Sequence, residues 1–188
     1  RLLVPCKPRR KPSILNSMRV KKFGKNDFEV RAAGSHIRVI KIVPKQIVTR
    51  ESRVKAKVRH GLVVSDTKND VLKMAVVERH KKSGNIGLGF VKGFGLKRGA
   101  VASSVAHDSH NIIAVGASDE DIVVAVGMLI EQRGGLVVIN EGKATASLPL
   151  PIAGLMTDAP ASVVAAQLET LRKASRSLGC KLKEPFLQ

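Results

Sequence analysis

The sequence predicts an α+β fold, in which a β-rich N-terminal half is followed by a mixed sheet with two packed helices. Two observations support this class. Short runs that are apolar, or that alternate between apolar and polar residues, dominate the first half of the chain and indicate strands. In the second half, two longer segments repeat apolar residues at helical spacing, and strand patterns lie between them. The hydrophobic content of 44% is enough for a core, and no apolar run approaches the length of a membrane span, about 18 residues.

The N-terminal part of the chain divides into a connector and a β-rich segment. Residues 1–17 contain three prolines and the basic cluster Lys7–Lys11, so we expect a basic connector. Residues 18–70 form the β-rich segment, with an antiparallel sheet that includes strands at His36–Val43 and Arg53–Arg59. The second strand alternates cleanly. Its cationic side chains are predicted to face water, because unpaired buried charges are costly; they are Arg53, Lys55, Lys57 and Arg59.

Residues 71–188 are predicted to form an α+β domain of their own. Ser118 and Asp121 form a capping box at the start of the first helix, and Gly179 stops the second. The two runs between the helices flank a Gly-containing turn and predict a hairpin. The predicted elements are a strand at Val71–Val77, a helix from Ser118 to Gly134, strands at Leu136–Ile139 and Lys143–Leu148, and a helix from about Pro160 to Leu178.

Lys and Arg are concentrated in the first hundred residues. Residues 1–100 carry 26 basic and 6 acidic side chains (+20), whereas residues 101–188 carry 7 and 9 (−2), which gives a net charge of +18. Such an asymmetry is typical of nucleic-acid binding, so a stand-alone basic nucleic-acid-binding domain is the alternative function. Against it, the chain has no Trp or Tyr for base stacking, and its five Phe are not interleaved with the basic residues.

Motifs of several other protein classes are missing from the sequence. Cys6 and Cys180 match neither a CxxC pair nor a zinc-site spacing, so we expect inert, reduced thiols and a cytoplasmic protein. The glycine-rich stretch at residues 84–99 has neither the GxGxxG nor the GxxxxGK[ST] spacing. The sequence therefore gives no support for a phosphate-binding loop.

The most informative stretch is His107-Asp108-Ser109-His110-Asn111, the HDSHN loop, which lies between two apolar runs. An imidazole can transfer protons at neutral pH, and a neighbouring carboxylate can orient it. We therefore take His107, Asp108 and His110 as catalytic candidates. Ser109 and Asn111 are candidates for lining a pocket. Two imidazoles and one carboxylate leave a metal site short of ligands, so no metal is predicted in this chain. The alternative is a polar turn that only links two strands.

Four segments in a fixed order carry a resemblance to a known family. The chain resembles the C-terminal domain of bacterial and archaeal adenine deaminases, which are members of the amidohydrolase superfamily. The resemblance is dense from about Val71 to Gly179 and thin before that. Its segments are Glu78-Arg79-His80 with Gly84–Arg98, Gly99–Gly116, Gly134–Val138 and Leu148–Met156.

The resemblance implies a full-length enzyme that hydrolyses adenine to hypoxanthine and ammonia. It further implies that a (β/α)8 barrel holds a divalent metal, Mn or Fe, which activates the water. Such a barrel needs roughly 200 residues or more, and this chain of 188 has no HxH motif and no run of alternating strands and helices. We expect the barrel to be absent, the isolated chain to be inactive, and no cofactor to bind to it. The expected partners are the barrel domain, adenine as substrate and further copies of the enzyme, but no membrane or nucleic acid.

In this setting the HDSHN loop is predicted to close over the mouth of the barrel. The alternative places His107 and His110 in a buried structural network. Glu78-Arg79-His80 follows an apolar strand, and the simplest expectation is a local salt bridge with a capping His. In the other interpretation, Glu78 and His80 form a second face of the same pocket as the HDSHN loop.

Overall fold

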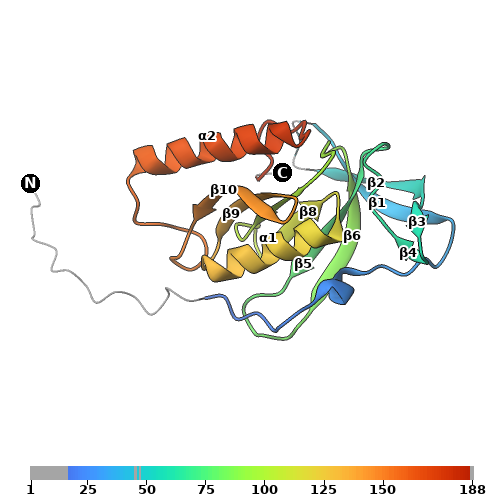
Figure 1. The fold of residues 1–188 in the computed structure, drawn as a ribbon, viewed down its shortest axis with the longest axis horizontal. Helices are drawn as coiled ribbons and strands as arrows, with labels where there is room; N and C mark the ends of the chain where they lie inside the picture. Colours follow the sequence, from blue (N-terminus) through green and yellow to red (C-terminus); the bar gives the residue numbers. More distant parts are fainter. Residues whose placement is uncertain (1–16, 45, 47, 187–188) are drawn as a thin grey trace, which may run out of the picture.

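A mixed eight-stranded sheet forms the centre of the molecule, and one helix packs on each of its faces (Figure 1). The computed structural model describes residues 17–186 apart from Lys45 and Ile47. The strand order in the sheet is β10-β9-β7-β8-β5-β6-β1-β2, and β3 pairs with β4 separately. The elements are η2 (Lys25–Phe28), β1 (His36–Ile42), β2 (Thr49–Lys55), β3 (Val58–Arg59), β4 (Leu62–Val63), β5 (Val71–Val77), β6 (Ile86–Lys92), β7 (Ala100–Ser103), β8 (Ile112–Gly116), α1 (Asp119–Glu131), β9 (Gly135–Asn140), β10 (Lys143–Pro149) and α2 (Ala161–Ser177).

The predicted α+β class is confirmed. The sheet is mixed because β1 and β6 are parallel, whereas the pairs β1–β2, β5–β6, β5–β8, β7–β8, β7–β9 and β9–β10 are antiparallel. The predicted β-rich segment 18–70 supplies β1 and β2, and the predicted domain 71–188 supplies β5 to β10, so both contribute to one sheet. Except for Ser17, the predicted connector at residues 1–17 lies outside the described residues.

Alternate residues of the central strands pack on opposite faces, because successive side chains of a strand point to opposite sides of the sheet. Ala100, Ala102 and Ala114 lie in the core cluster that includes α1. Val101 and Val115, from the same two strands, lie in the cluster that includes α2. The strands β7 and β8 therefore carry buried apolar side chains on both faces, and they hold the two ends of the HDSHN loop in place.

Both predicted helices and the predicted β9–β10 hairpin are confirmed. Ser118 caps α1, and its Oγ accepts a hydrogen bond from the Asp121 amide at 3.2 Å. Leu171 of α2 is fully buried against the sheet, and Gly179 (φ +101°) follows the end of this helix. No helix in the described part of the chain is long and apolar enough to cross a membrane.

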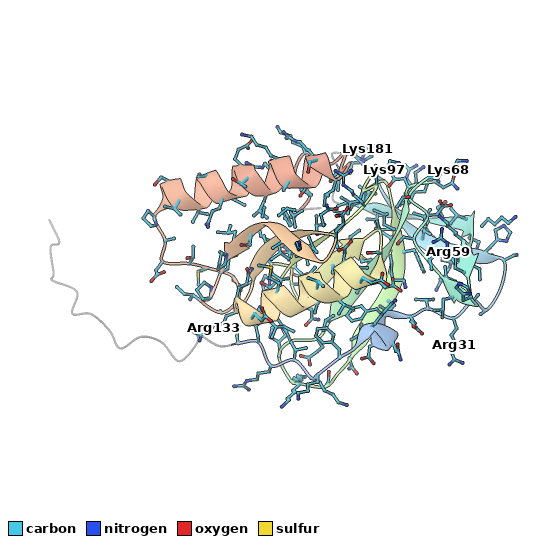
Figure 2. All side chains as sticks on the ribbon, in the orientation of Figure 1. Arg31, Arg59, Lys68, Lys97, Arg133 and Lys181 are labelled. Atoms are coloured by element: carbon cyan, nitrogen blue, oxygen red, sulfur yellow. The ribbon has the colours of Figure 1, made fainter. Side chains whose placement is uncertain are left out.

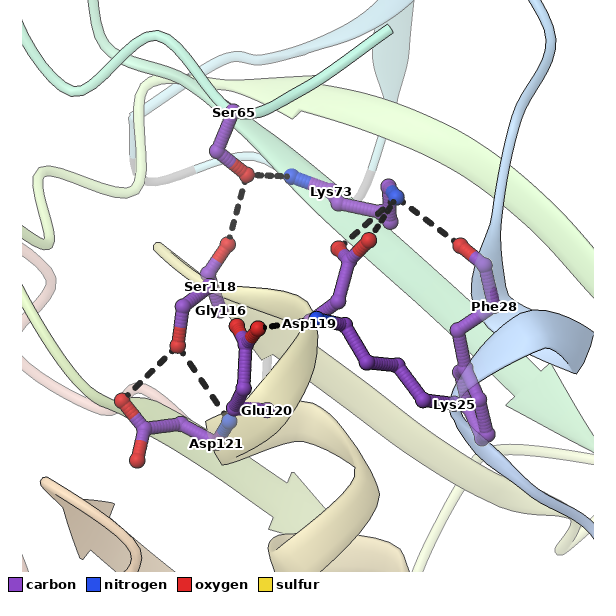
Figure 3. Close-up of polar contacts among 9 residues, drawn as sticks. All are labelled: Lys25, Phe28, Ser65, Lys73, Gly116, Ser118, Asp119, Glu120 and Asp121. Atoms are coloured by element: carbon purple, nitrogen blue, oxygen red, sulfur yellow. Dashed lines mark hydrogen bonds and ion pairs between the residues drawn. The ribbon is translucent and has the colours of Figure 1, made fainter. Parts of the chain in front are cut away.

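A buried polar network fixes the start of α1 against the sheet (Figure 3). The side chain of Lys73, on β5, is fully buried. Its Nζ donates hydrogen bonds to Asp119 Oδ2 at 2.7 Å and to the Phe28 carbonyl oxygen at 2.8 Å. The cation is therefore both neutralised and hydrogen-bonded, which is the condition under which a charge can be buried.

The strand expected at Arg53–Arg59 is wrong in its bounds. The strand β2 begins at Thr49 and ends at Lys55, opposite His36, where β1 begins. Beyond Lys55 the chain has no partner residues in β1, so Val58 and Arg59 pair with β4 instead. The prediction that the basic side chains face water is confirmed, because three of the four are exposed and the fourth is partly exposed; they are Arg53, Lys55, Arg59 and, partly, Lys57.

Candidate functional site

The HDSHN loop joins the paired strands β7 and β8, as the sequence predicts. Asp108 (φ +65°) and His110 (φ +46°) adopt the left-handed backbone conformation, which is uncommon for residues other than glycine. The His110 amide donates to the Ala106 carbonyl at 2.8 Å, and the Ser109 amide donates to the His107 carbonyl at 3.0 Å. These bonds close the loop on itself and give it a defined shape.

His107 and Asp108 lie at the outer tip of the loop, with side chains that are 96% and 91% exposed. His107 Nδ1 lies 3.0 Å from Asp108 Oδ1. Neighbouring side chains of a strand point to opposite sides, and the left-handed turn at Asp108 is what lets these two converge. A carboxylate at Nδ1 orients an imidazole and leaves Nε2 to exchange a proton with solvent or substrate. The alternative of a buried network does not describe His107 in this chain.

His110 and Asn111 lie on the inner side of the loop, and both residues are half-buried. His110 Nδ1 and Asn111 Oδ1 are buried atoms with no hydrogen-bond partner among the described residues. A buried polar atom without a partner costs about 1–3 kcal/mol. This side of the loop is therefore left with unmet hydrogen-bonding capacity by the part of the chain that the structure describes.

Arg79 and His80 hold the loop from the end of the neighbouring strand β5. The guanidinium of Arg79 donates through Nε to the His110 carbonyl, through Nη1 to Ser17 Oγ at 3.0 Å and through Nη2 to the Ala153 carbonyl at 3.1 Å. His80 Nε2 donates to the Ser109 carbonyl at 2.9 Å. The segment Glu78-Arg79-His80 and the HDSHN loop, which are separate candidates in the sequence, are therefore in contact in the fold.

Sequence reasoning missed the role of Arg79, which is 1% exposed. No carboxylate lies within 4.0 Å of its guanidinium in the described part of the chain, and burial lowers the pKa of Arg79. A signal was present in the sequence: Arg79 continues the period-two series of Ala75 and Val77, both buried, so its side chain points to the same face of the sheet.

The local salt bridge expected within Glu78-Arg79-His80 is not formed. Glu78 instead accepts hydrogen bonds from the backbone amides of His80, Lys81 (2.7 Å) and Ser83 (3.1 Å), and from Ser83 Oγ at 2.9 Å. Burial opposes ionisation of this carboxyl group, but the donors outweigh burial and hold the pKa of Glu78 at about 2. Glu78 thus shapes the turn from which Arg79 and His80 reach the loop.

An apolar cavity of about 500 Å³ opens beside the loop, and His107 and His110 stand at its rim. Its walls come from β1, β5, β7 and β8, and from Pro185 and Phe186 near the end of the chain. The other five predicted site residues do not line it; they are Glu78, His80, Asp108, Ser109 and Asn111. The structure thus brings all seven predicted site residues to one end of the sheet but places only the two loop histidines at the cavity.

No group of three His, Cys, Asp or Glu side chains that could hold a metal ion exists among the described residues. The divalent metal implied by the resemblance therefore has no fitting site in this part of the chain. Cys180 is a buried free thiol, and burial raises its pKa, while Cys6 lies outside the described residues.

The positive charge of the chain is spread over several elements. Figure 2 shows labelled basic side chains that project from separate loops and strands, and all six are exposed: Arg31, Arg59, Lys68, Lys97, Arg133 and Lys181. The five Phe rings of the sequence are all buried or half-buried. Since the chain has no Trp or Tyr, no fully exposed Phe, Tyr or Trp ring is present to stack on a nucleic-acid base.

Comparison with known proteins gives one consistent result. A sequence model of the family described as adenine deaminase C-terminal domain matches residues 46–188. The chain is 48% identical over 174 residues to an adenine deaminase of Dehalococcoides mccartyi, 51% over 163 residues to one of Methanothrix thermoacetophila, and 50% over 173 residues to one of Brucella anthropi. These alignments cover 93%, 87% and 92% of this chain. The chain belongs to the adenine deaminase C-terminal domain family.

The same alignments cover 30%, 29% and 31% of those adenine deaminases. The chain thus spans about 30% of the length of the relatives that it matches. The resemblance stated from the sequence is confirmed. No (β/α)8 barrel is present among residues 17–186 as the structure describes them.

Proposed function

We propose that this chain is the C-terminal domain of an enzyme that hydrolyses adenine to hypoxanthine and ammonia, and that its HDSHN loop contributes to the active site. One observation supports the proposed role of the HDSHN loop in the active site. The loop presents an exposed His107–Asp108 pair on a backbone that is held in place by Arg79 and His80. The first part is supported by about 50% identity to adenine deaminases over most of the chain.

The chemistry of deamination explains what an imidazole could add. Water adds to the ring carbon that carries the amino group, and ammonia leaves. A proton must therefore leave the water and another must reach the departing nitrogen. His107 is suited to this transfer, because Asp108 faces its Nδ1 and its Nε2 is left towards solvent. The metal belongs to the part of the enzyme outside this chain.

Substitution of His107 in the full-length enzyme tests the proposal. His107→Ala should lower kcat by about 100-fold or more, the usual effect of losing a proton-transfer group. The melting temperature should stay near that of the unmodified enzyme, because the side chain is 96% exposed in this chain. Asp108→Asn should also lower kcat while keeping the loop shape, since Asn tolerates a positive φ.

An exposed histidine elsewhere supplies the control. His36→Ala on β1 should leave both kcat and melting temperature unchanged, because His36 is exposed and lies outside the loop. A His107→Ala enzyme with a kcat within about twofold of the unmodified enzyme, a change too small for a lost proton shuttle, would contradict the proposed role.

A further inference from the structure

Within the part of the chain that the structure describes, one face of the sheet is covered by a helix over only part of its width. The helix α2 packs on β10 and β9, and its buried residues belong to the cluster with Leu136, Val138 and Leu148. The apolar cavity of about 500 Å³ lies further along the same face, over β8, β5 and β1. Met74 and Ile113 form part of its floor, and Ile40 at its edge is 41% exposed. An apolar surface of this kind marks an interaction site.

The lining does not suit a small polar ligand. A small-molecule site needs a few convergent polar groups to orient its ligand. The hydroxyl of Ser103, on the wall, is already engaged with the Val105 amide at 2.9 Å and the Val105 carbonyl at 3.1 Å. The other polar side chains of the lining are Thr49, His107 and His110, of which the two histidines stand at the rim. The walls are suited to apolar protein side chains.

We propose that the remainder of the same polypeptide, which contains the catalytic barrel, docks on this face and covers the cavity. This inference rests on the proposed function, because it takes that remainder to be the catalytic part. The chain spans only 30% of a relative's length, so a much larger part of the polypeptide is available to cover the face. At the rim, the side chain of His107 is 96% exposed, so a docked surface can reach it.

Docking on this face has a direct consequence for the loop. His107 and His110 belong both to the cavity rim and to the HDSHN loop. A partner seated in the cavity therefore lies against the loop and brings its own surface to the His107 imidazole. Arg79 and His80 fix the backbone of the loop from the opposite side, through the carbonyls of His110 and Ser109. The face and the loop together form one contact region.

Cysteine labelling in the full-length enzyme tests the docking. Thr49 lines the cavity and is exposed in this chain, and Thr170 on α2 is also exposed but lies away from the cavity. We expect maleimide to label a Thr49→Cys enzyme at least about tenfold more slowly than a Thr170→Cys enzyme, as for an interface that is open less than a tenth of the time. Mass spectrometry of the labelled peptides separates these sites from other cysteines. Equal rates would overturn the proposal.

The alternative occupants give different patterns of labelling. Protection that disappears on dilution to nanomolar enzyme would show a second copy in the cavity, and protection that requires added adenine would show a small-molecule site. Either result overturns docking by the same polypeptide. Protection of Thr49→Cys with an unaffected kcat in His107→Ala leaves the docking in place and refutes the catalytic role. Unprotected Thr49→Cys together with a lowered kcat in His107→Ala refutes the docking and leaves the catalytic role in place.

A charge on the face supplies a second readout. Ile40 (41% exposed) and Val58 (46% exposed) both lie in strands, but Val58 is outside the cavity. Ile40→Asp should lower kcat/KM by about tenfold or more, because it places an unpaired charge in the interface. Val58→Asp should leave kcat/KM within about twofold, as expected for a surface substitution away from the interface. Equal effects of the two substitutions would contradict the assignment of this face.

Discussion

Arg79 gives the sharpest test of how the HDSHN loop is held. Arg79→Met keeps much of the aliphatic stem but removes all three hydrogen bonds of the guanidinium, to His110, Ser17 and Ala153. Each buried acceptor left without a donor costs about 1–3 kcal/mol. Removal of an unpaired buried cation offsets part of this cost, because its desolvation opposes folding. We expect the free energy of unfolding to fall by about 2–4 kcal/mol.

Two measurements on the Arg79→Met protein follow from this account. Urea unfolding gives the loss of stability, and hydrogen exchange at the His110 amide reports the loop, since that amide donates to Ala106. Exchange should become about tenfold faster or more, in line with local opening. Arg98→Met is the matched control, because Arg98 is exposed and donates a single bond to the Ser177 carbonyl at 3.2 Å. Unchanged stability and unchanged loop exchange in Arg79→Met would refute the anchoring role of Arg79.

Two further predictions concern the turn at Glu78 and the packing of Gly99. The pKa of Glu78 is held at about 2, below its ordinary value of 4.5. Its carboxylate therefore stabilises the fold fully above about pH 4.5 and loses this effect as the pH falls towards 2. Urea unfolding should therefore show Glu78→Gln to be less stable than the unmodified protein at pH 6, with the difference shrinking below pH 4.5; a difference independent of pH would count against this. Gly99 (φ +70°) and Gly142 (φ +73°) share a backbone conformation. A Cβ on Gly99 would clash with the Ile139 carbonyl oxygen, whereas a Cβ on Gly142 would meet open space. Gly142→Ala should cost about 1–2 kcal/mol from the backbone alone, and Gly99→Ala should cost several kcal/mol more; similar melting temperatures for the two variants would disprove the close contact.

Local signals in the sequence were sufficient for most elements of the fold. The capping box at Ser118 depends on residues within one helical turn, and the period-two pattern of Val71–Val77 depends on neighbours in the same strand. The pairing of strands in the sheet could not be predicted in this way, because no local pattern indicates which strand lies next to which. The strand expected at Arg53–Arg59 therefore had the wrong ends, which are set by where β1 begins at His36. The order of the eight strands could not be read from the sequence for the same reason.

The candidate site was predictable in its residue types but not in its contacts. Histidine and carboxylate side chains at a bend between apolar runs identified the HDSHN loop without any structure. The contact from Arg79 to the His110 carbonyl joins residues that are 31 positions apart. It depends on β5 and β8 being neighbours in the sheet, which the sequence does not state. The acceptors are also main-chain carbonyls, which every residue carries, so no residue type could point to them.

The energetics of the loop bear on whether it serves structure or function. A polar turn that only links two strands has no need of strain, yet Asp108 and His110 both adopt left-handed backbone conformations that cost an ordinary residue about 1–2 kcal/mol each. Among the described residues, the loop also contains two buried polar atoms without hydrogen-bond partners, and it is held by a buried Arg79 that has hydrogen bonds but no carboxylate partner. Backbone strain of this kind clusters at functional sites. A docked catalytic part would meet the exposed His107, which the left-handed turn at Asp108 brings together with the Asp108 carboxylate.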